Sequence, residues 1–201
     1  ISINGFACRA LRMSYVGELG WELYVPAGEA ESLAKALERS GASYGLRYAG
    51  FHAMNSLRLE AGYRHWGHDI TGEDTPLEAG LGFTISWDKP GGFIGREALL
   101  PSKGKVPTKR LIQIRVEDPD LLTYHDDPIF KNGNLVGRTT GGMWSVTENR
   151  CLTMSYVGNE NGVSKAWVDE GEWEIEIGMR RRKVTASVES FYDPRHERVR
   201  N

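Results

Sequence analysis

The feature that most constrains the fold is a change of pattern near residue 108. Beyond it, β-type apolar runs follow one another at regular spacing, without helical segments between them. Asn132-Gly133 stands between two of these runs and predicts a hairpin turn. Such spacing predicts a small antiparallel barrel or sandwich. The predicted strands cover residues 111–116, 128–130, 135–140, 151–156, 173–177 and 183–188.

Helical periodicity dominates before this point. Residues 29–39 and residues about 50–61 each place apolar side chains on one helical face. Gly41 is suited to a left-handed cap that ends the first helix, and Gly62 stops the second. The predicted apolar stripes are Ala30, Leu33, Ala34 and Leu37 in the first helix, and Ala53, Met54, Leu57 and Ala61 in the second; Asn55, Arg58 and Glu60 are the polar members of the second.

The segment between the second helix and the β runs carries a strong local signal. Thr75-Pro76-Leu77-Glu78 is a capping box that predicts a short helix. A strand over 83–87 and a helical turn over 94–100 are predicted to follow. The polar, breaker-rich residues 101–108 read as a linker. The sequence therefore predicts an α+β domain at 1–100 and a β domain at 109–201.

Residues 13–25, MSYVGELGWELYV, predict a β-hairpin. Two apolar-rich runs, 11–16 and 21–25, flank a turn with two glycines. Tyr15 lies on one arm and Glu22 on the other, so both can face one pocket. A carboxylate placed there can accept two N–H bonds from a flat heterocycle. Spacing alone favours the alternative, an amphipathic hairpin with an exposed Glu22 and a half-buried Tyr15, because surface carboxylates are the norm.

The composition excludes some classes of protein. The chain is 40% hydrophobic and 26% charged with a net charge of −2, which gives no general drive toward nucleic acid or an anionic membrane. No apolar run approaches the roughly 18 residues of a membrane span. Cys8 and Cys151 are far apart and predict two free thiols in a reducing compartment. The chain begins at Ile1 without an initiator methionine, and we expect a fragment of a longer protein.

Two clusters of polar residues have competing interpretations. His65, His68 and Asp69 suggest a metal, but Gly67 argues against a shared helical face and no third His or Cys is near. Ordinary hydrogen-bonded histidines in a loop are favoured, and no metal site is predicted. The basic run 180–183 is more typical of a solvated turn beside a strand than of a phosphate contact.

Several long sequence segments resemble the aminomethyltransferase, or glycine-cleavage T-protein, superfamily. They are SYVGELGWELYVP (14–26), SLRLEAGYRHWGHDI (56–70) and TPLEAGLGFTISWDKPGGFIGREALL (75–100). GYRHWGHDI and the DKP…FIGREAL run look most like the folate-binding module of dimethylglycine and sarcosine dehydrogenases. GNLVGRTTGG and FYDPRHERVR resemble the C-terminal barrel of the same family.

The resemblance implies a partial folate-binding lobe followed by a Greek-key-like antiparallel β-barrel. In the family, tetrahydrofolate accepts a one-carbon unit. Glu22 matches the family glutamate that binds the pterin ring, and Tyr15 matches the tyrosine that lines it. The family's key aspartate and the FAD domain of the dehydrogenases lie upstream, so the resemblance assigns no catalytic residue here.

One departure bears on the branch of the family. Met54-Asn55 stands where plain T-proteins have an Arg-Asp pair, so the folate-holding arginine is absent. This favours the folate-binding C-terminal part of a flavin-linked N-methyl amino acid dehydrogenase. We expect this part to be catalytically inactive without the rest of its chain. The alternatives are a stand-alone aminomethyltransferase working with a lipoyl carrier, or a non-catalytic folate-fold binding module. The expected location is the cytoplasm, or the mitochondrial matrix in a eukaryote.

Overall fold

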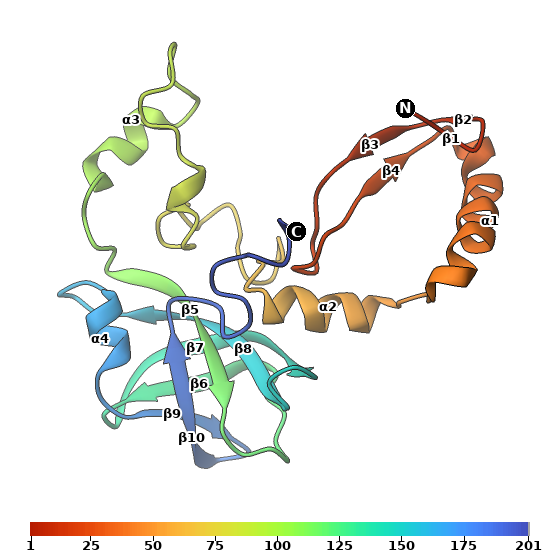
Figure 1. Ribbon diagram of the computed structural model, residues 1–201. Coiled ribbons are helices and arrows are strands. Elements are labelled where there is room, and N and C mark those ends of the chain that lie inside the picture. The colour runs from red at the N-terminus through yellow and green to blue at the C-terminus, as the bar shows by residue number, and fades with distance from the viewer. Residues whose placement is uncertain (201) are drawn as a thin grey trace.

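A closed antiparallel β-barrel forms the largest part of the computed structural model, which describes residues 1–200 (Figure 1). Neighbouring strands follow the order β10-β5-β8-β7-β6-β9, and the barrel closes between β9 and β10. Each predicted run falls on one of these strands, with only Val188 beyond a strand end, so the barrel prediction is confirmed. The strands are β5 (Lys109–Val116), β6 (His125–Lys131), β7 (Asn134–Ser145), β8 (Arg150–Gly158), β9 (Trp173–Ile177) and β10 (Arg180–Ser187).

The connections of the barrel follow from its turns. Asn132 and Gly133 both have positive φ, 49° and 79°, as the predicted hairpin turn between β6 and β7 requires. Strand β5 pairs with β8 beside the β6–β7–β8 meander, which is a Greek-key arrangement. Apolar side chains that alternate along the strands fill the barrel, among them Ile112, Ile114 and Ile175.

The first residues form an arm that stands away from the barrel (Figure 1). Two short hairpins, β1 (Ser2–Ile3) with β2 (Phe6–Ala7) and β3 (Arg9–Leu11) with β4 (Glu22–Tyr24), lead into a helix. The predicted hairpin at 13–25 is therefore present, but its first arm ends at Leu11. Tyr15 lies in the ten-residue connection instead, which folds back so that an added Cβ on Gly20 would lie 3.0 Å from the carbonyl oxygen of Met13.

Helix α1 (Ala30–Gly41) confirms the first helical prediction with two corrections. Its buried side chains are Leu33 and Ala36, whereas Ala34 is exposed. Gly41 is not a left-handed cap, because its φ is −81° and a 3₁₀ turn, Ala42–Tyr44, continues the helix. The left-handed position is Gly45, with φ of 77°, which ends that turn.

Helix α2 (Phe51–Glu60) is also present, but its predicted buried stripe is only partly confirmed, since Ala61 is buried and Met54 half-buried. Ala53 and Leu57 are exposed, and burial falls on the consecutive residues 58–61. The reason is that α2 meets the barrel with its C-terminal end rather than with one side (Figure 1). An end-on contact buries every side of the last turn, so the helical period carries no information there.

Residues 71–108 form a second projecting segment with little regular structure. The capping box is confirmed, since Thr75 Oγ1 and Glu78 exchange hydrogen bonds of 2.7 and 3.2 Å, but it closes a turn rather than a regular helix. The predicted strand at 83–87 is wrong: a 3₁₀ turn, Gly82–Thr84, covers its start, and no strand within residues 1–200 pairs with it. Helix α3 (Arg96–Leu99) and a 3₁₀ turn, Leu100–Ser102, follow.

The remaining helix, α4 (Lys165–Asp169), was not predicted and lies between β8 and β9. Ser164 caps it by accepting a hydrogen bond of 3.1 Å from the Trp167 N–H. Within residues 1–200 no helix has the length and apolar character that a membrane crossing needs. Cys8 and Cys151 are both buried free thiols, as predicted. The barrel begins at Lys109, but the division of the chain into domains stays a prediction.

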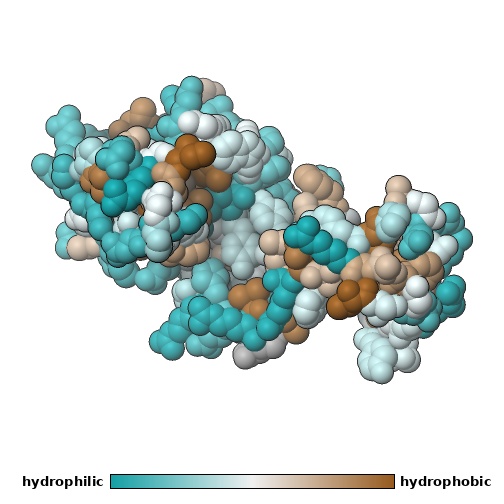
Figure 2. Space-filling view, turned by 90° about the horizontal axis from the view of Figure 1, so that it is seen from above, coloured by the Kyte–Doolittle hydropathy of each residue, from teal (hydrophilic) through white to brown (hydrophobic). Residues whose placement is uncertain are grey.

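The arm also carries much of the exposed apolar surface. Figure 2 shows apolar residues gathered on the part of the molecule that Figure 1 identifies as the N-terminal arm. Ile1 is 75% and Trp21 is 60% exposed, and with Ile3, Ala10 and Leu23 they line a shallow apolar groove.

Candidate functional site

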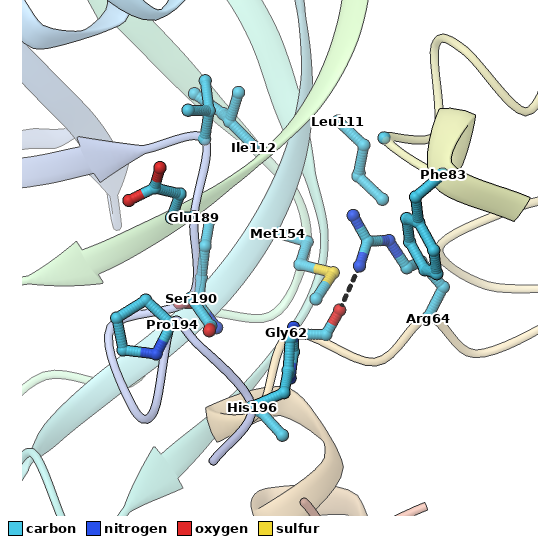
Figure 3. Close-up of a pocket in the computed structure, with 14 residues that line it drawn as sticks. Gly62, Arg64, Phe83, Leu111, Ile112, Met154, Glu189, Ser190, Pro194 and His196 are labelled. Atoms are coloured by element: carbon cyan, nitrogen blue, oxygen red, sulfur yellow. Dashed lines mark hydrogen bonds between the residues drawn. The ribbon is translucent and has the colours of Figure 1, made fainter.

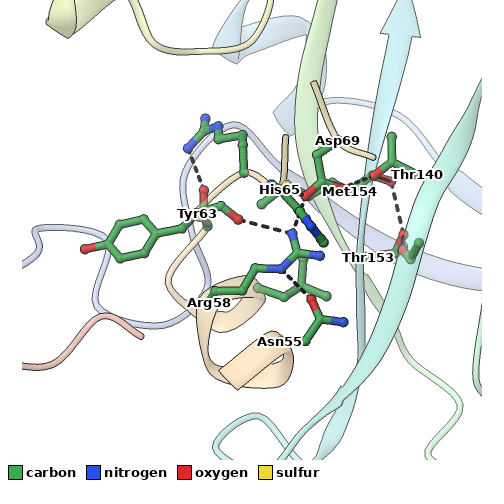
Figure 4. A network of polar contacts seen from close by, with 12 residues as sticks. Asn55, Arg58, Tyr63, His65, Asp69, Thr140, Thr153 and Met154 are labelled. Carbon is green, nitrogen blue, oxygen red and sulfur yellow. Dashed lines mark hydrogen bonds and ion pairs between the residues drawn. The ribbon is translucent and has the colours of Figure 1, made fainter. Parts of the chain in front are cut away.

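A buried ion pair fixes the end of α2 to the loop that follows it. The Arg58 guanidinium pairs with the Asp69 carboxylate, and the two residues are 5% and 2% exposed (Figure 4). Arg58 also donates to Asn55 Oδ1 at 2.7 Å and to the Tyr63 carbonyl at 3.2 Å. The ion pair therefore joins one turn of α2 to both ends of the loop at residues 63–69.

Asp69 carries this connection onward to the barrel. Its carboxylate accepts hydrogen bonds from the His65 N–H, at 2.9 Å, and from the Thr140 hydroxyl on β7. Because both oxygens of Asp69 are engaged, the carboxylate is a fixed part of the structure and is not free to bind a ligand. The sequence alone gave Arg58 and Asp69 no such role.

Glu60 makes a second buried attachment to the barrel. It is 1% exposed and accepts hydrogen bonds from Ser145 Oγ at 2.6 Å, Thr147 Oγ1 at 2.9 Å and the Thr147 N–H at 3.2 Å. Gln113 of β5 adds a third, since it donates to the Leu59 carbonyl and accepts from the Phe191 N–H at 2.6 Å. The end of α2, the barrel and the C-terminal segment are thus held as one unit.

Tyr15 lies on this unit, at the end of an aromatic ladder. Its hydroxyl donates to the Arg64 carbonyl at 2.9 Å, and its ring is stacked on Tyr63, with centroids 6.2 Å apart and planes inclined by 17°. Tyr63 is stacked in turn on His196, at 6.0 Å and 14°. Burial raises the pKa of Tyr15 above its usual value of 10, so the phenol stays protonated at neutral pH. Three distant segments therefore present a row of nearly parallel rings.

Glu22 lies elsewhere, on β4 of the arm, and its side chain is exposed. It accepts a hydrogen bond of 2.5 Å from the Tyr24 hydroxyl. Within residues 1–200 no hydrogen bond links Glu22 to Tyr15. The structure therefore holds Tyr15 against the barrel unit and leaves Glu22 open to solvent, and a shared pocket for the two remains a prediction.

A half-open cavity of about 180 Å³ lies between the end of α2, the barrel and the C-terminal segment (Figure 3). Arg64, Leu111, Met154 and Ser190 are among its lining residues. Arg64 donates from Nε to the Ala79 carbonyl at 3.0 Å and from Nη1 to the Gly62 carbonyl at 2.5 Å. Burial lowers the pKa of Arg64, although an arginine remains charged at any physiological pH.

The histidines of the loop pack together without a carboxylate between them. The rings of His65 and His68 lie 4.4 Å apart, while Asp69 is engaged by Arg58. Partial burial lowers the pKa of His65, and the neighbouring His68 and Arg58 lower it further. The described part of the chain holds no cluster of three or more His, Cys, Asp or Glu side chains arranged for a metal ion.

The basic run at the start of β10 packs on the barrel surface. The Arg181 guanidinium lies 3.7 Å above the centre of the Phe130 ring and 3.5 Å from Glu174, and Arg182 lies 3.8 Å from Asp118. The run is largely exposed to solvent, as the favoured interpretation has it, but it lies in β10 itself and not in a turn beside a strand.

Comparison with known proteins identifies relatives of both halves of the chain. Residues 1–89 match the family described as GCVT N-terminal domain, and residues 109–193 match the one described as Glycine cleavage T-protein C-terminal barrel domain. The crystal structure of glycine cleavage system aminomethyltransferase T from Bartonella henselae superposes with a TM-score of 0.76 at 30% identity. The match covers 90% of this chain and 48% of that one.

Two curated relatives match almost the whole sequence. 4-Methylaminobutanoate oxidase (formaldehyde-forming) of Paenarthrobacter nicotinovorans is 42% identical over 98% of this chain and 23% of its own length. The mitochondrial sarcosine dehydrogenase of Mus musculus is 36% identical over 98% of this chain and 21% of its own length. The chain thus spans about a fifth of these relatives.

Proposed function

Because this chain belongs to the glycine cleavage T-protein family, we propose that it is the tetrahydrofolate-binding part of a flavin-linked N-methyl amino acid dehydrogenase. The observation that carries the proposal is the match over 98% of the chain to two enzymes whose named substrates, 4-methylaminobutanoate and sarcosine, are both N-methyl amino acids. In this proposal an upstream flavin domain oxidises the amine, and the present chain holds the acceptor of the one-carbon unit.

The residues present offer two kinds of contact to a folate. Tyr15 supplies a flat ring that its hydrogen bond to the Arg64 carbonyl fixes in place, beside the parallel ring of Tyr63. Glu22 supplies an exposed carboxylate that can accept N–H bonds from a pterin in a bidentate manner. Met54, half-buried on α2, adds only apolar contact at the position where T-proteins carry a charge. When bound, tetrahydrofolate supplies the amine nitrogens that take up the one-carbon unit.

The work of this chain is positional. These residues would hold a folate in a fixed place and orientation, and such placement of a reactant can lower a barrier by several kcal/mol, about 7–11 in the best cases. The rigid attachment of α2 to the barrel, through Arg58, Glu60 and Asp69, suits this task because it keeps the Tyr15 ring at a fixed position.

The product of the intact enzyme tests this function. The intact protein would be given an N-methyl amino acid, with and without tetrahydrofolate, while formaldehyde and methylene-tetrahydrofolate are measured. We expect tetrahydrofolate to suppress formaldehyde and to yield methylene-tetrahydrofolate in its place. The second candidate is release of free formaldehyde, which the name of the Paenarthrobacter nicotinovorans relative favours. An equal yield of formaldehyde under both conditions, or methylene-tetrahydrofolate formed no faster than from added formaldehyde without the enzyme, would support that candidate and contradict ours.

Two further alternatives have their own signatures. A stand-alone aminomethyltransferase would have no flavin domain in its open reading frame and would need a lipoyl carrier; the Bartonella henselae protein is named as an aminomethyltransferase. A non-catalytic folate-fold module would lack the family aspartate upstream. In a eukaryote the proposed enzyme would belong in the mitochondrion, in keeping with the name of the Mus musculus relative.

Replacing Glu22 tests its proposed contact with the pterin. Glu22→Ala is expected to weaken tetrahydrofolate binding by about 1.5–3 kcal/mol, the range for a hydrogen bond to a charged group. Glu73→Ala removes an exposed carboxylate from the segment beyond α2 and is the matched control, with no expected change. Calorimetric titration of the intact protein measures both variants, and equal affinities would reject the role of Glu22.

A further inference from the structure

The connection between β3 and β4, residues 12–21, carries Tyr15 and lies against the end of α2. Gly17 makes the closest approach: a Cβ added to it would lie 2.6 Å from the Cβ of Ala61, and its φ is +76°. The Tyr15 hydroxyl donates to the Arg64 carbonyl at 2.9 Å. The end of α2 and the loop after it thus supply one set of contacts to the connection.

The C-terminal segment, residues 188–200, supplies a second set of contacts to the same connection. The Tyr192 hydroxyl donates to Glu18 Oε1 at 2.5 Å, and Arg12 Nη2 donates to the Arg200 carbonyl at 2.9 Å. The hydrogen bond to Glu18 raises the pKa of Tyr192 above its usual value of 10, so the hydroxyl remains a donor at neutral pH. Figure 1 shows this segment leaving the barrel and ending beside the turn of the arm.

His196 adds a stacking contact to these hydrogen bonds. Its ring is stacked on Tyr63, with centroids 6.0 Å apart and planes inclined by 14°, and Tyr63 is stacked in turn on Tyr15. Both tyrosines are half-buried. Without the His196 ring, one side of Tyr63 loses its neighbour, and the ring that supports Tyr15 is less firmly placed. The C-terminal segment therefore acts on Tyr15 through Tyr63 as well as through the connection.

The backbone of the C-terminal segment is shaped for this contact. Asp193 and His196 have φ of 44° and 52°, left-handed values that are uncommon outside glycine. Asp193 closes the turn, since its carboxylate accepts from the N–H groups of Glu197 and Arg198 at 3.0 and 2.9 Å, and its carbonyl accepts from the His196 N–H at 2.9 Å. Such conformations persist where the surrounding contacts fix them. The turn thus holds the His196 ring over Tyr63.

We propose that the C-terminal segment is a clasp that fixes the connection and its Tyr15 ring to the barrel unit, with Tyr192 and His196 as positioning residues. The barrel anchors the clasp, because the Phe191 N–H donates to Gln113 Oε1 at 2.6 Å. His196 lies beyond residues 109–193, which the barrel family matches. The effect of the clasp on folate rests on the proposed function, whereas its hold on the connection does not.

Nitration of Tyr15 in the intact protein tests the clasp without any folate. Tetranitromethane modifies accessible tyrosines, and peptide mass spectrometry gives the rate at Tyr15 relative to that at Tyr44, which is 90% exposed. His196→Asn removes the ring but keeps a residue type that tolerates a left-handed backbone, and Tyr192→Phe removes only the hydroxyl. We expect each variant to raise the relative rate at Tyr15 at least threefold. A rate unchanged in both variants would overturn the proposal.

Further variants control this measurement. Glu18→Gln keeps an oxygen acceptor for the Tyr192 hydroxyl and should be nitrated like the wild type, whereas Glu18→Ala should behave like Tyr192→Phe. Tyr124→Phe and His125→Asn change exposed side chains at the start of β6 and should leave the rate at Tyr15 unchanged. Equal rates in Glu18→Ala and Glu18→Gln would contradict a positioning role for the Tyr192 hydroxyl.

Calorimetric titration of the same variants with tetrahydrofolate connects the clasp to the proposed function. We expect His196→Asn and Tyr192→Phe to weaken binding at least threefold, because the Tyr15 ring is no longer held in one orientation, and Glu18→Gln to bind like the wild type. Wild-type affinity in both variants, despite faster nitration, would overturn the positioning role. If the wild-type protein binds no tetrahydrofolate, the proposed function fails, and the nitration rates alone decide whether the clasp holds Tyr15.

Discussion

Asp69→Ala is expected to lower the free energy of unfolding by about 3–5 kcal/mol, the usual cost of removing one partner from a buried ion pair. The variant leaves the Arg58 guanidinium buried at 5% exposure with only the Asn55 and Tyr63 oxygens as partners. It also removes the acceptor of the His65 N–H and of the Thr140 hydroxyl. Urea unfolding followed by tryptophan fluorescence measures the loss.

Two controls separate a buried charge effect from simple loss of a contact. Arg58→Met combined with Asp69→Leu replaces both charges by apolar groups and should recover most of the lost stability. Glu31→Ala breaks the exposed ion pair with Lys35, whose side chains are 81% and 61% accessible, and should cost less than about 1 kcal/mol. If Asp69→Ala costs no more than Glu31→Ala, the ion pair does not anchor α2.

Glu60→Ala should produce the second-largest loss, about 3 kcal/mol, because three hydrogen bonds to one buried carboxylate disappear together. Ser145 Oγ is buried and loses the partner 2.6 Å away, while the exposed Thr147 can turn to water. The same urea experiment applies, and the unfolding transition that reports on the barrel should shift with that of α2.

Glu60→Gln is the matched variant for this attachment. It keeps the shape of the side chain and one oxygen acceptor, so Ser145 retains its bond and the expected loss is only about 1 kcal/mol. Equal losses in Glu60→Ala and Glu60→Gln would mean that the charge, rather than the acceptor geometry, holds the helix. Stability close to wild type in Glu60→Ala would contradict the attachment itself.

The barrel could be predicted from the sequence because strand pairing leaves a local signature. Alternating side chains and turn residues at even spacing are properties of each strand and its neighbour, and Asn132-Gly133 is a turn whose geometry its residue types dictate. The predicted strand at 83–87 is wrong because a strand also needs a neighbouring strand, which its own residues do not reveal. Its composition suits a strand, but the described residues include no strand that pairs with it, and a strand without a partner leaves its backbone groups unpaired.

The attachment of α2 could not be predicted, because it depends on what meets the end of the helix. Arg58 and Glu60 have the composition of an exposed face, yet both are buried once β7 and the loop at 63–69 close over them. Their partners Asp69 and Ser145 are 11 and 85 residues away. Hydrophobic periodicity predicts which side of a helix is buried, but it does not predict a contact at the end of the helix.

The candidate site could likewise be predicted from the sequence only in part. Tyr15 and Glu22 came from a resemblance over a long stretch of sequence, and a hairpin was predictable from the two glycines between them. The stacking of Tyr15 on Tyr63 and of Tyr63 on His196 joins three distant segments and leaves no local pattern. The same holds for the cavity, whose lining residues Gly62, Leu111 and Ser190 come from distant parts of the chain.

Direct titration of the intact protein with tetrahydrofolate, followed by isothermal calorimetry, tests the central claim most directly. The account predicts saturable binding at one site per chain, lost or strongly weakened when Tyr15→Ala and Glu22→Ala are combined, under conditions in which both proteins are folded. Absence of binding by the wild-type protein, or equal binding by the double variant, would contradict it.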